Sequence, residues 1–328
     1  MPDRVLVTWM GYDARGARTG ARLAETGLEP RLAPKTGART AAETAALARD
    51  AIAAIVSTDP FDASVFNAAP RLRTIARVGV GTDSIDLDAA TAAGVVVTTT
   101  PGLNQETTAD HAVALLLAAL RRLPEHDASV RRGEWSRAGA LTPWDLHGTT
   151  VGLVGCGAIG RKVARRLAGF GVRLLVCDPA ATAAGPWELV DLPALLERAD
   201  AISLHLPLTR ATRGLIDGRR LAAMRPTAVL VNTSRGGLVD EVALQRALAS
   251  GRLRAAALDV FADEPEVPPG LAALPNVILT PHIGGLSERS IARMTERATQ
   301  HVIDVLRGAP DPGVVANPAV LHASEVPA

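Results

Sequence analysis

The sequence of 328 residues contains little cysteine and few aromatic side chains. Its two cysteines, Cys156 and Cys177, are too few for a disulfide framework or a metal cluster, which favours a reducing compartment. No apolar signal segment opens the chain, so we expect a cytoplasmic location. Aromatic residues make up 3% of the total, and the core must therefore be built from Ala, Val, Leu and Ile.

Long apolar runs and an excess of charge of one sign are also missing. No stretch reaches the roughly 18 consecutive apolar residues that favour a membrane span. The formal net charge is +1 and no dense basic block occurs, so neither a membrane nor a nucleic acid is expected as a partner. Hydrophobic residues at 48% and charged residues at 21% are typical of a globular protein, and the length suffices for two domains.

One glycine-rich stretch lies between a strand pattern and a helix pattern. Residues 151–154 predict a buried strand, and Gly155, Gly157 and Gly160 form a G-x-G-x-x-G run at the start of an amphipathic helix. The first glycine permits a tight turn, the second lets a pyrophosphate approach the backbone, and the third lets helix and strand pack closely. The helix start then supplies an anion site. In the structural alternative, the run is an ordinary turn of a strand–helix–strand unit.

A second strand pattern, residues 172–178, strengthens the ligand-binding interpretation. It ends in Asp178, about 20 residues beyond the glycine run, where a carboxylate binds the ribose hydroxyls of the adenosine. The same carboxylate would repel the 2′-phosphate of NADP. We therefore expect NAD to be the cofactor, preferred over NADP by at least about tenfold. No metal is expected.

Strands alternate with helices along most of the chain. Five strand patterns precede residue 98 and six more occur between residues 150 and 282, and such alternation predicts parallel sheets. We therefore predict an α/β fold with two doubly wound parallel-sheet domains. A Rossmann NAD-binding domain, 104–287, is inserted into a discontinuous flavodoxin-like substrate domain, 1–103 and 288–328.

Two local signals refine this architecture. Thr40 and Glu43 have the spacing of a capping box at a helix start. A long helix, nearly continuous in its apolar residues, should run from about residue 105 to 132, with a kink or a division at Pro124.

Candidate catalytic side chains follow the later strands, because ligands of open α/β sheets bind outside the carboxyl ends of the strands. Arg235 precedes two glycines, and its planar guanidinium suits a carboxylate bound at two points. His282 is the natural group for moving a proton near neutral pH, and Glu264 can orient its imidazole. Structural alternatives are an interdomain salt bridge for Arg235 and a packed or surface position for His282.

Four motifs together resemble the D-2-hydroxyacid dehydrogenase family, and within it the D-3-phosphoglycerate dehydrogenase branch. They occur in the order and with the spacing of the family, and the similarity extends from about Val78 to Asn317. The motifs occupy residues 155–160, 232–240, 259–265 and 281–285. We expect the short form, without the regulatory domain of longer members.

The resemblance implies an NAD-dependent enzyme with three catalytic residues. Protonated His282 would give a proton to the keto oxygen in reduction and act as the base in oxidation, while Glu264 holds and polarises it. Arg235 would bind the substrate carboxylate and the keto oxygen. The family turn that holds the carboxylate through backbone N–H groups corresponds to Gly79, Val80 and Gly81.

The same resemblance implies the cofactor contacts. Besides the three glycines of the run, the residues expected to contact NAD are Thr108, Ala158, Ile159, Asp178, His205, Pro207, Thr212, Thr233 and Asp259. Asp259 is expected to receive the nicotinamide amide.

The part of the substrate beyond its carboxylate leaves alternatives open. Arg77 matches an arginine of the phosphoglycerate branch and suits an anionic tail, 3-phosphoglycerate-like or phosphonate-like, but it can equally be a structural arginine. After the third strand, where that branch carries an arginine, serine and threonine run, this sequence reads Val-Ser-Thr-Asp-Pro at 56–60, and the acid Asp59 would oppose a phosphate. Glyoxylate or hydroxypyruvate fits the same features.

Two further functional classes share these residues. One class is a nucleotide-sensing corepressor that binds protein partners, and the other is a phosphite dehydrogenase.

Family members are commonly dimers. We therefore expect a homodimer formed through the cofactor domain, with the connector from Trp135 to Trp144 as part of the contact. We predict that Trp135 and Trp144 are both buried and anchor the connector by packing.

Overall fold

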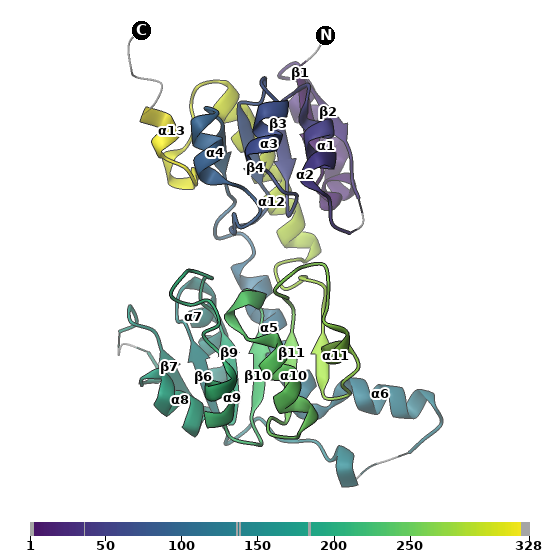
Figure 1. The fold of residues 1–328 in the computed structure, drawn as a ribbon, viewed down its shortest axis with the longest axis vertical. Helices are drawn as coiled ribbons and strands as arrows, with labels where there is room; N and C mark the ends of the chain where they lie inside the picture. Colours follow the sequence, from purple (N-terminus) through teal and green to yellow (C-terminus); the bar gives the residue numbers. More distant parts are fainter. Residues whose placement is uncertain (1–2, 36, 136, 138, 183–184, 323–328) are drawn as a thin grey trace. The chain divides into compact units, whose positions relative to one another are not determined.

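The computed structural model describes residues 3–35, 37–135, 137, 139–182 and 185–322. The chain divides into two compact units, each built on its own sheet (Figure 1). Unit 1 combines the residues up to Asn104 with those from Leu286 onward, and unit 2 runs from Gln105 to Gly285. The polypeptide therefore leaves unit 1 once and returns to it once.

Unit 1 contains a five-stranded sheet in which every pairing is parallel. Its strand order, β2-β1-β3-β4-β5, is that of flavodoxin-like sheets. The strands are β1 (Asp3–Val7), β2 (Leu28–Leu32), β3 (Ala51–Val56), β4 (Thr74–Arg77) and β5 (Val96–Thr98). The helical segments are η1 (Met10–Arg15), α1 (Gly16–Ala24), α2 (Ala41–Ala48), α3 (Ala63–Ala68), α4 (Leu87–Ala92), α12 (Glu288–Leu306), η4 (Pro312–Val314) and α13 (Ala319–His322).

The core of unit 1 lies on both faces of its sheet, because successive side chains of a strand point to opposite faces. On one face, Leu6 and Ile75 pack with residues of α2, α3 and α4. On the other face, Val5 and Ile55 pack with Val302 and its neighbours on α12. The last long helix of the chain therefore completes the core of the first sheet.

Unit 2 contains a seven-stranded parallel sheet in the order β12-β11-β10-β9-β6-β7-β8. The strands are β6 (Thr150–Val154), β7 (Arg173–Cys177), β8 (Glu188–Leu189), β9 (Ala201–Leu204), β10 (Val229–Asn232), β11 (Ala255–Leu258) and β12 (Val277–Leu279). The helical segments are α5 (Gln105–Arg121), α6 (Leu123–Arg131), η2 (Gly139–Leu141), α7 (Ala158–Ala168), α8 (Leu192–Arg198), α9 (Gly218–Ala223), η3 (Gly236–Leu238), α10 (Glu241–Ala249) and α11 (Pro269–Ala272).

The same alternation of side chains gives unit 2 a core on each face of its sheet. Leu153 and Val231 pack against α5 and α7 on one face. Val154 and Leu230 pack with residues of α8, α9 and α10 on the other, and Figure 1 shows these three helices in front of the strands. Two parallel sheets with helices on both faces confirm the predicted α/β fold class.

Two local predictions are confirmed. The N–H group of Glu43 donates to Thr40 Oγ1 at 3.2 Å, and the N–H group of Thr40 donates to Glu43 Oε2 at 2.8 Å, which completes the capping box. The long helix is divided into α5 and α6 at Arg122, which has a left-handed φ of 52°. Pro124 lies in the first turn of α6, where its missing N–H group costs no helical hydrogen bond.

Two other predictions are wrong. Trp135 is not a buried anchor, because 80% of it is exposed, whereas Trp144 packs against the core with the Arg254 guanidinium 3.5 Å from its ring centroid. Among the described residues, the sheet of unit 2 has seven strands and not six. The missed strand, β8, has two exposed residues and so lacks any apolar pattern.

None of the helices in the described ranges combines the length and apolar character needed to cross a membrane.

Candidate active site

The carboxyl edge of the unit 2 sheet gathers most of the polar residues that the sequence singles out. Because the strands are parallel, their carboxyl ends lie along one edge. The direction of chain progression reverses between the neighbouring strands β6 and β9, and ligands of such sheets bind in the crevice at that point. The glycine run follows β6, and His205 follows β9.

The glycine run forms the turn from β6 into α7. Gly155 has a φ of 93°, and a Cβ on it would lie 2.3 Å from the carbonyl oxygen of His205. A Cβ on Gly160 would lie 2.3 Å from the carbonyl oxygen of Gly155, so neither position admits a side chain. A Cβ on Gly157, the N-cap of α7, would meet no atom within 4 Å. The turn is thus tightly packed at Gly155 and Gly160, whereas the space in front of the helix start is open at Gly157.

Asp178 fixes the next loop beside this turn. Its carboxylate accepts a hydrogen bond from the N–H group of Cys156 at 2.6 Å and another from that of Ala180 at 2.8 Å. The α7 helix begins with Ala158 and Ile159, whose N–H groups belong to a first turn that lacks intrahelical acceptors. A carboxylate at the end of β7 and an open helix start are the two features that a dinucleotide needs.

Two buried polar atoms at the same edge have no hydrogen-bond partner among the described residues. They are Nδ1 of His205 and Oγ1 of Thr233. The other ring nitrogen of His205 lies 2.9 Å from Ser203 Oγ, and burial lowers the pKa of His205 to about 4, so the ring is neutral at pH 7. Because buried polar atoms are normally paired, these orphans beside an open glycine turn fit a polar group such as NAD.

Three other predicted cofactor residues lie near this edge or on the helix behind it. Thr212 Oγ1 donates to the carbonyl oxygen of Pro207 at 2.7 Å, and this bond closes the turn after β9. Thr108 is buried on α5. These contacts explain the local structure and assign no ligand to the three residues.

The structure brings Glu264 and His282 together. Nδ1 of His282 lies 2.7 Å from Oε2 of Glu264, and the other carboxylate oxygen accepts the N–H group of Phe261 at 3.1 Å. The side chains of Glu264 and His282 remain 30% and 35% exposed, so they are accessible from solvent. With Nδ1–H donating to the carboxylate, Nε2 is the ring atom that can exchange a proton with a substrate.

His282 has an unusual backbone conformation, which a buried carboxylate supports. Its φ is 55°, in the left-handed region, and its N–H group donates to the carbonyl oxygen of Asp259 at 2.8 Å. The Asp259 side chain, 1% exposed, accepts the N–H groups of Ile283 at 2.9 Å and Gly284 at 2.7 Å. The predicted cofactor residue Asp259 is therefore engaged by the loop that carries His282.

Arg235 lies on the neighbouring loop, after β10. Its Nη1 donates to the carbonyl oxygen of Ser234 at 2.6 Å. A Cβ on Gly236 would lie 1.9 Å from the carbonyl carbon of Phe261, so the Arg235 loop packs directly on the backbone that leads to Glu264. The three predicted catalytic residues thus come from three consecutive loops at one edge of one sheet.

In unit 1, taken by itself, the turn predicted to bind the substrate carboxylate follows β4. Gly79 has a φ of 132° and donates its N–H group to Thr100 Oγ1 at 2.7 Å. This bond uses an N–H group that the prediction assigned to substrate. In the described part of unit 1, the N–H groups of Val80 and Gly81 donate to no backbone acceptor, so they are the donors that the turn can offer.

Arg77 folds over this turn. Its Nη1 donates to the carbonyl oxygen of Val78 at 2.9 Å and lies 1.3 Å from the position that a Cβ on Gly79 would occupy. The φ of Gly79 is what disfavours a side chain at this position, and the guanidinium fills the space beside it. The arrangement places a positive charge against the turn, although the guanidinium also has the structural role that the sequence left open.

Asp59 is neutralised by neighbouring groups of unit 1. Its Oδ1 lies 3.1 Å from Arg39 Nε, and the two side chains are only 13% and 5% exposed. Its Oδ2 accepts the Thr8 hydroxyl at 2.5 Å. The expectation that Asp59 opposes an anionic substrate assumed an unpaired charge, and the structure removes that basis.

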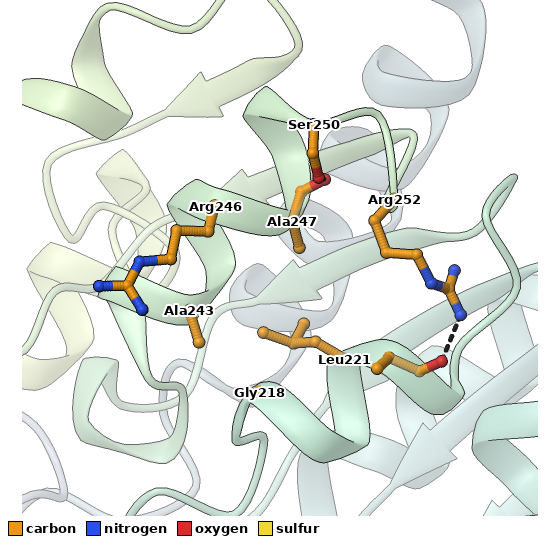
Figure 2. A pocket seen from close by; sticks show the side chains of 8 residues that line it. Gly218, Leu221, Ala243, Arg246, Ala247, Ser250 and Arg252 are labelled. Atoms are coloured by element: carbon orange, nitrogen blue, oxygen red, sulfur yellow. Dashed lines mark hydrogen bonds between the residues drawn. The ribbon is translucent and has the colours of Figure 1, made fainter.

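A hollow of about 270 Å³ lies between α9 and α10 (Figure 2). Leu221 and Ala243 belong to its apolar wall, and Arg246 and Arg252 stand at its sides. The Arg252 guanidinium donates to the carbonyl oxygen of Ala222 and so caps the end of α9. No predicted catalytic or cofactor residue lines this hollow, so it is separate from the candidate active site.

Comparison with known proteins decides the family. Residues 113–284 match the model of the NAD binding domain of the D-isomer specific 2-hydroxyacid dehydrogenases. The chain belongs to this family. The predicted class, an NAD-dependent oxidoreductase, is thereby confirmed.

Individual relatives of this dehydrogenase differ in name and length. A glyoxylate reductase of Korarchaeum cryptofilum is 46% identical over 275 residues, 81% of this chain and 82% of that protein. A D-3-phosphoglycerate dehydrogenase of Mycobacterium tuberculosis is 46% identical over 267 residues, 80% of this chain but 50% of that protein, so the chain spans about half of its length. The crystal structure of the TT0316 protein from Thermus thermophilus shares 40% identity with a TM-score of 0.86, covering 95% of this chain and 99% of that one.

Sequence reasoning missed two polar residues that support the loops of the candidate active site. His111, on α5, lies 3.1 Å from Thr280 Oγ1 through its Nε2. Glu241, at the start of α10, accepts the N–H group of Ala262 at 2.8 Å, and burial, followed by nearby Asp263 and Glu264, raises the pKa of Glu241. His111 comes one helical turn after Thr108, and this spacing is the feature of the sequence that could have identified it.

Proposed function

We propose that this dehydrogenase interconverts a 2-keto acid and the corresponding D-2-hydroxy acid, with His282 as the proton donor and acceptor. The observation that carries the proposal is the 2.7 Å contact between His282 Nδ1 and Glu264 Oε2 at the strand edge that also bears the open glycine turn. A histidine oriented by a carboxylate is suited to general acid–base catalysis.

NAD would be held by the residues of the carboxyl edge of unit 2. The glycine run and the start of α7 would bind the pyrophosphate, and Asp178 would bind the adenosine ribose. His205 and Thr233 offer their unpaired buried atoms to the same group. When bound, the reduced cofactor supplies a hydride to the keto carbon.

The protein residues supply the proton and the charge stabilisation. In reduction, Nε2 of His282 delivers its proton to the carbonyl oxygen, while Nδ1–H stays bonded to Glu264. The carboxylate stabilises the imidazolium and keeps the ring oriented. Arg235 binds the substrate carboxylate and lowers the cost of charge that develops on the keto oxygen. In oxidation, neutral His282 removes the hydroxyl proton.

A substrate with an anionic tail is our finer proposal. The guanidinium of Arg77 lies against the Gly79 turn, and the charge of Asp59 is compensated by Arg39, while the Thr8 hydroxyl donates a hydrogen bond to it. In unit 1, the N–H groups of Val80 and Gly81 are proposed to bind the substrate carboxylate. Glyoxylate is the second candidate, because the Korarchaeum cryptofilum relative named as a glyoxylate reductase matches this chain over most of both lengths.

A panel of keto acids tests the function and its finer form. Glyoxylate, hydroxypyruvate, 3-phosphohydroxypyruvate and a phosphonate-bearing keto acid are each supplied with NADH, and the loss of NADH absorbance is followed. We expect the two acids with anionic tails to have the highest kcat/KM. Arg77→Gln should then raise KM for those two acids alone. Arg73 is an exposed arginine just before β4, and Arg73→Gln should leave KM for both acids unchanged.

The outcomes of the panel separate the remaining classes. Binding of NADH without turnover of any acid would support the nucleotide-sensing corepressor. Reduction of NAD on addition of phosphite would support a phosphite dehydrogenase. A highest kcat/KM for glyoxylate would replace the anionic tail by the second candidate.

We also propose that the enzyme is a homodimer in the cytoplasm and that α6 with the connector after it forms part of the contact. Leu123, Val130 and Trp135 are 55%, 56% and 80% exposed, and large apolar side chains gathered on one segment favour a protein interface. Light scattering on the purified enzyme tests this, and Trp135→Ser with Val130→Asp should shift it to the monomer.

A further inference from the structure

A second histidine lies beneath the loop of His282. Nε2 of His111, on α5, is 3.1 Å from Thr280 Oγ1 and 3.3 Å from Asp259 Oδ1. Its side chain is 18% exposed, and it comes from a helix that packs against β10, β11 and β12. His111 therefore joins the helix behind the sheet to the residues at the ends of two strands.

The direction of each hydrogen bond in this cluster can be assigned. Thr280 Oγ1 is 2.6 Å from Asp259 Oδ1 and must donate, because an ionised carboxylate is only an acceptor. The threonine oxygen is then an acceptor for His111, so Nε2 carries the proton. Burial alone would raise the pKa of Asp259, but hydrogen bonds from His111, Thr280 and the two loop N–H groups outweigh it and hold the pKa below its ordinary value.

Asp259 also holds the backbone of His282 and of the two residues that follow it. Its carboxylate accepts the N–H groups of Ile283 and Gly284, while the carbonyl oxygen of Asp259 accepts the N–H group of His282. The left-handed φ of 55° at His282 is unfavourable for a side chain with a Cβ, so surrounding contacts must maintain it. Most of these contacts involve Asp259, and the N–H group of His282 also lies 3.0 Å from the carbonyl oxygen of Thr280.

The packing around the loop leaves little freedom for a substitute arrangement. A Cβ on Gly284 would lie 2.8 Å from Asp259 Oδ2 and 3.3 Å from Cδ2 of the His111 ring. The imidazole thus occupies the space beside Gly284, next to the carboxylate. Removal of the ring would leave a buried carboxylate with one donor fewer and a gap under Gly284.

We propose that His111 is a positioning residue that, through Thr280 and Asp259, holds His282 in the left-handed conformation from which its imidazole reaches Glu264. The inference rests on the proposed catalytic role of His282. His111 acts on catalysis through the loop and makes no contact with the reacting atoms.

Matched variants test this role. His111→Leu removes the donor, His111→Gln keeps a side-chain N–H donor, and His147→Leu changes an exposed loop histidine of the same unit as a control. We expect kcat to fall about tenfold or more in His111→Leu, because a displacement of about 1 Å can cost 100-fold. KM for NADH should stay within about twofold, and His111→Gln should recover most of kcat.

A double variant separates positioning from a general loss of structure. In a His282→Asn background, His111→Leu should lower the residual kcat by less than about twofold, because its effect passes through His282. An equal fall in both backgrounds, or an unchanged kcat in the single variant, would overturn the proposal.

Hydrogen exchange gives a readout that does not depend on turnover. The amides of Ile283 and Gly284 should exchange at least about tenfold faster in His111→Leu than in the parent or in His147→Leu. If no keto acid is turned over, the proposed function fails, while faster exchange still shows that His111 holds the loop. Unchanged exchange would contradict the positioning role itself.

Discussion

Nδ1 of His282 lies 2.7 Å from Oε2 of Glu264, although the two residues belong to different loops. The loop of His282 is fixed by Asp259, and the loop of Glu264 is fixed by Glu241 through the N–H group of Ala262. Asp259 stands at the start of the loop that carries Glu264, so this loop is held by Glu241 and in turn anchors the loop of His282. In the proposed reaction, this arrangement would keep the imidazole oriented while its charge changes.

Replacement of His282 by asparagine should remove the proton transfer and spare cofactor binding. We expect kcat for the preferred keto acid to fall by about 10²- to 10⁴-fold, the usual contribution of a general acid. The dissociation constant of NADH, measured by fluorescence, should change by less than about twofold. His147→Asn is the matched control, and loss of NADH binding in His282→Asn would remove the acid–base assignment.

Arg235→Lys should raise KM for the keto acid about tenfold or more, because an ammonium group cannot reproduce the planar pair of donors of a guanidinium. Steady-state kinetics with saturating NADH measure this effect. Arg246→Lys, in the hollow between α9 and α10, preserves charge at a position outside the proposed site and should leave KM unchanged. A wild-type KM in Arg235→Lys would move the carboxylate site elsewhere.

The parent enzyme should prefer NADH to NADPH by at least about tenfold in kcat/KM, because Asp178 places a negative charge where the 2′-phosphate would lie. Asp178→Ser should reduce this ratio at least about tenfold, because it removes the negative charge. Asp191→Ser, at the N-cap of α8, is the control. Equal use of both cofactors by the parent enzyme would contradict the assignment.

The stability of unit 2 should depend on pH through His205. Its pKa is about 4 in the folded protein, against about 6.5 in an unfolded chain, so the unfolded state binds the proton more tightly. The contribution to the free energy of unfolding is constant above pH 6.5 and is lost as pH falls from there toward 4. By pH 5 the loss should be about 2 kcal/mol. Urea titrations at pH 7.5 and 5 of the parent and His205→Gln measure it, and equal losses in both would exclude His205 as the cause.

The features that depend on neighbours in sequence could be predicted. The glycine run, the strand ending at Asp178 and the Thr40–Glu43 cap each lie within one strand–helix unit, so their spacing determines their geometry. The loops bearing Glu264 and His282 follow adjacent strands, β11 and β12, of a parallel sheet, and the meeting of these two residues was therefore expected from topology.

Contacts between distant segments could not be predicted. His111 and Thr280 are 169 residues apart, and their bond exists because α5 packs behind the strands that carry the loops. The use of the Gly79 N–H group by Thr100 and the pairing of Asp59 with Arg39 likewise depend on tertiary placement. Trp135 was misjudged for the same reason, because its size indicates burial but no neighbour in the sequence shows whether a partner surface exists.

The discontinuity of unit 1 has a consequence for synthesis on the ribosome. Val302 and its neighbours on α12 cover the face of the first sheet that Val5 and Ile55 expose, and they are translated only after the whole of unit 2. Tyr12 and Leu23, which are translated early, cover part of this face, and the rest stays uncovered while unit 2 emerges and folds. We expect the nascent chain to be prone to aggregation during that interval.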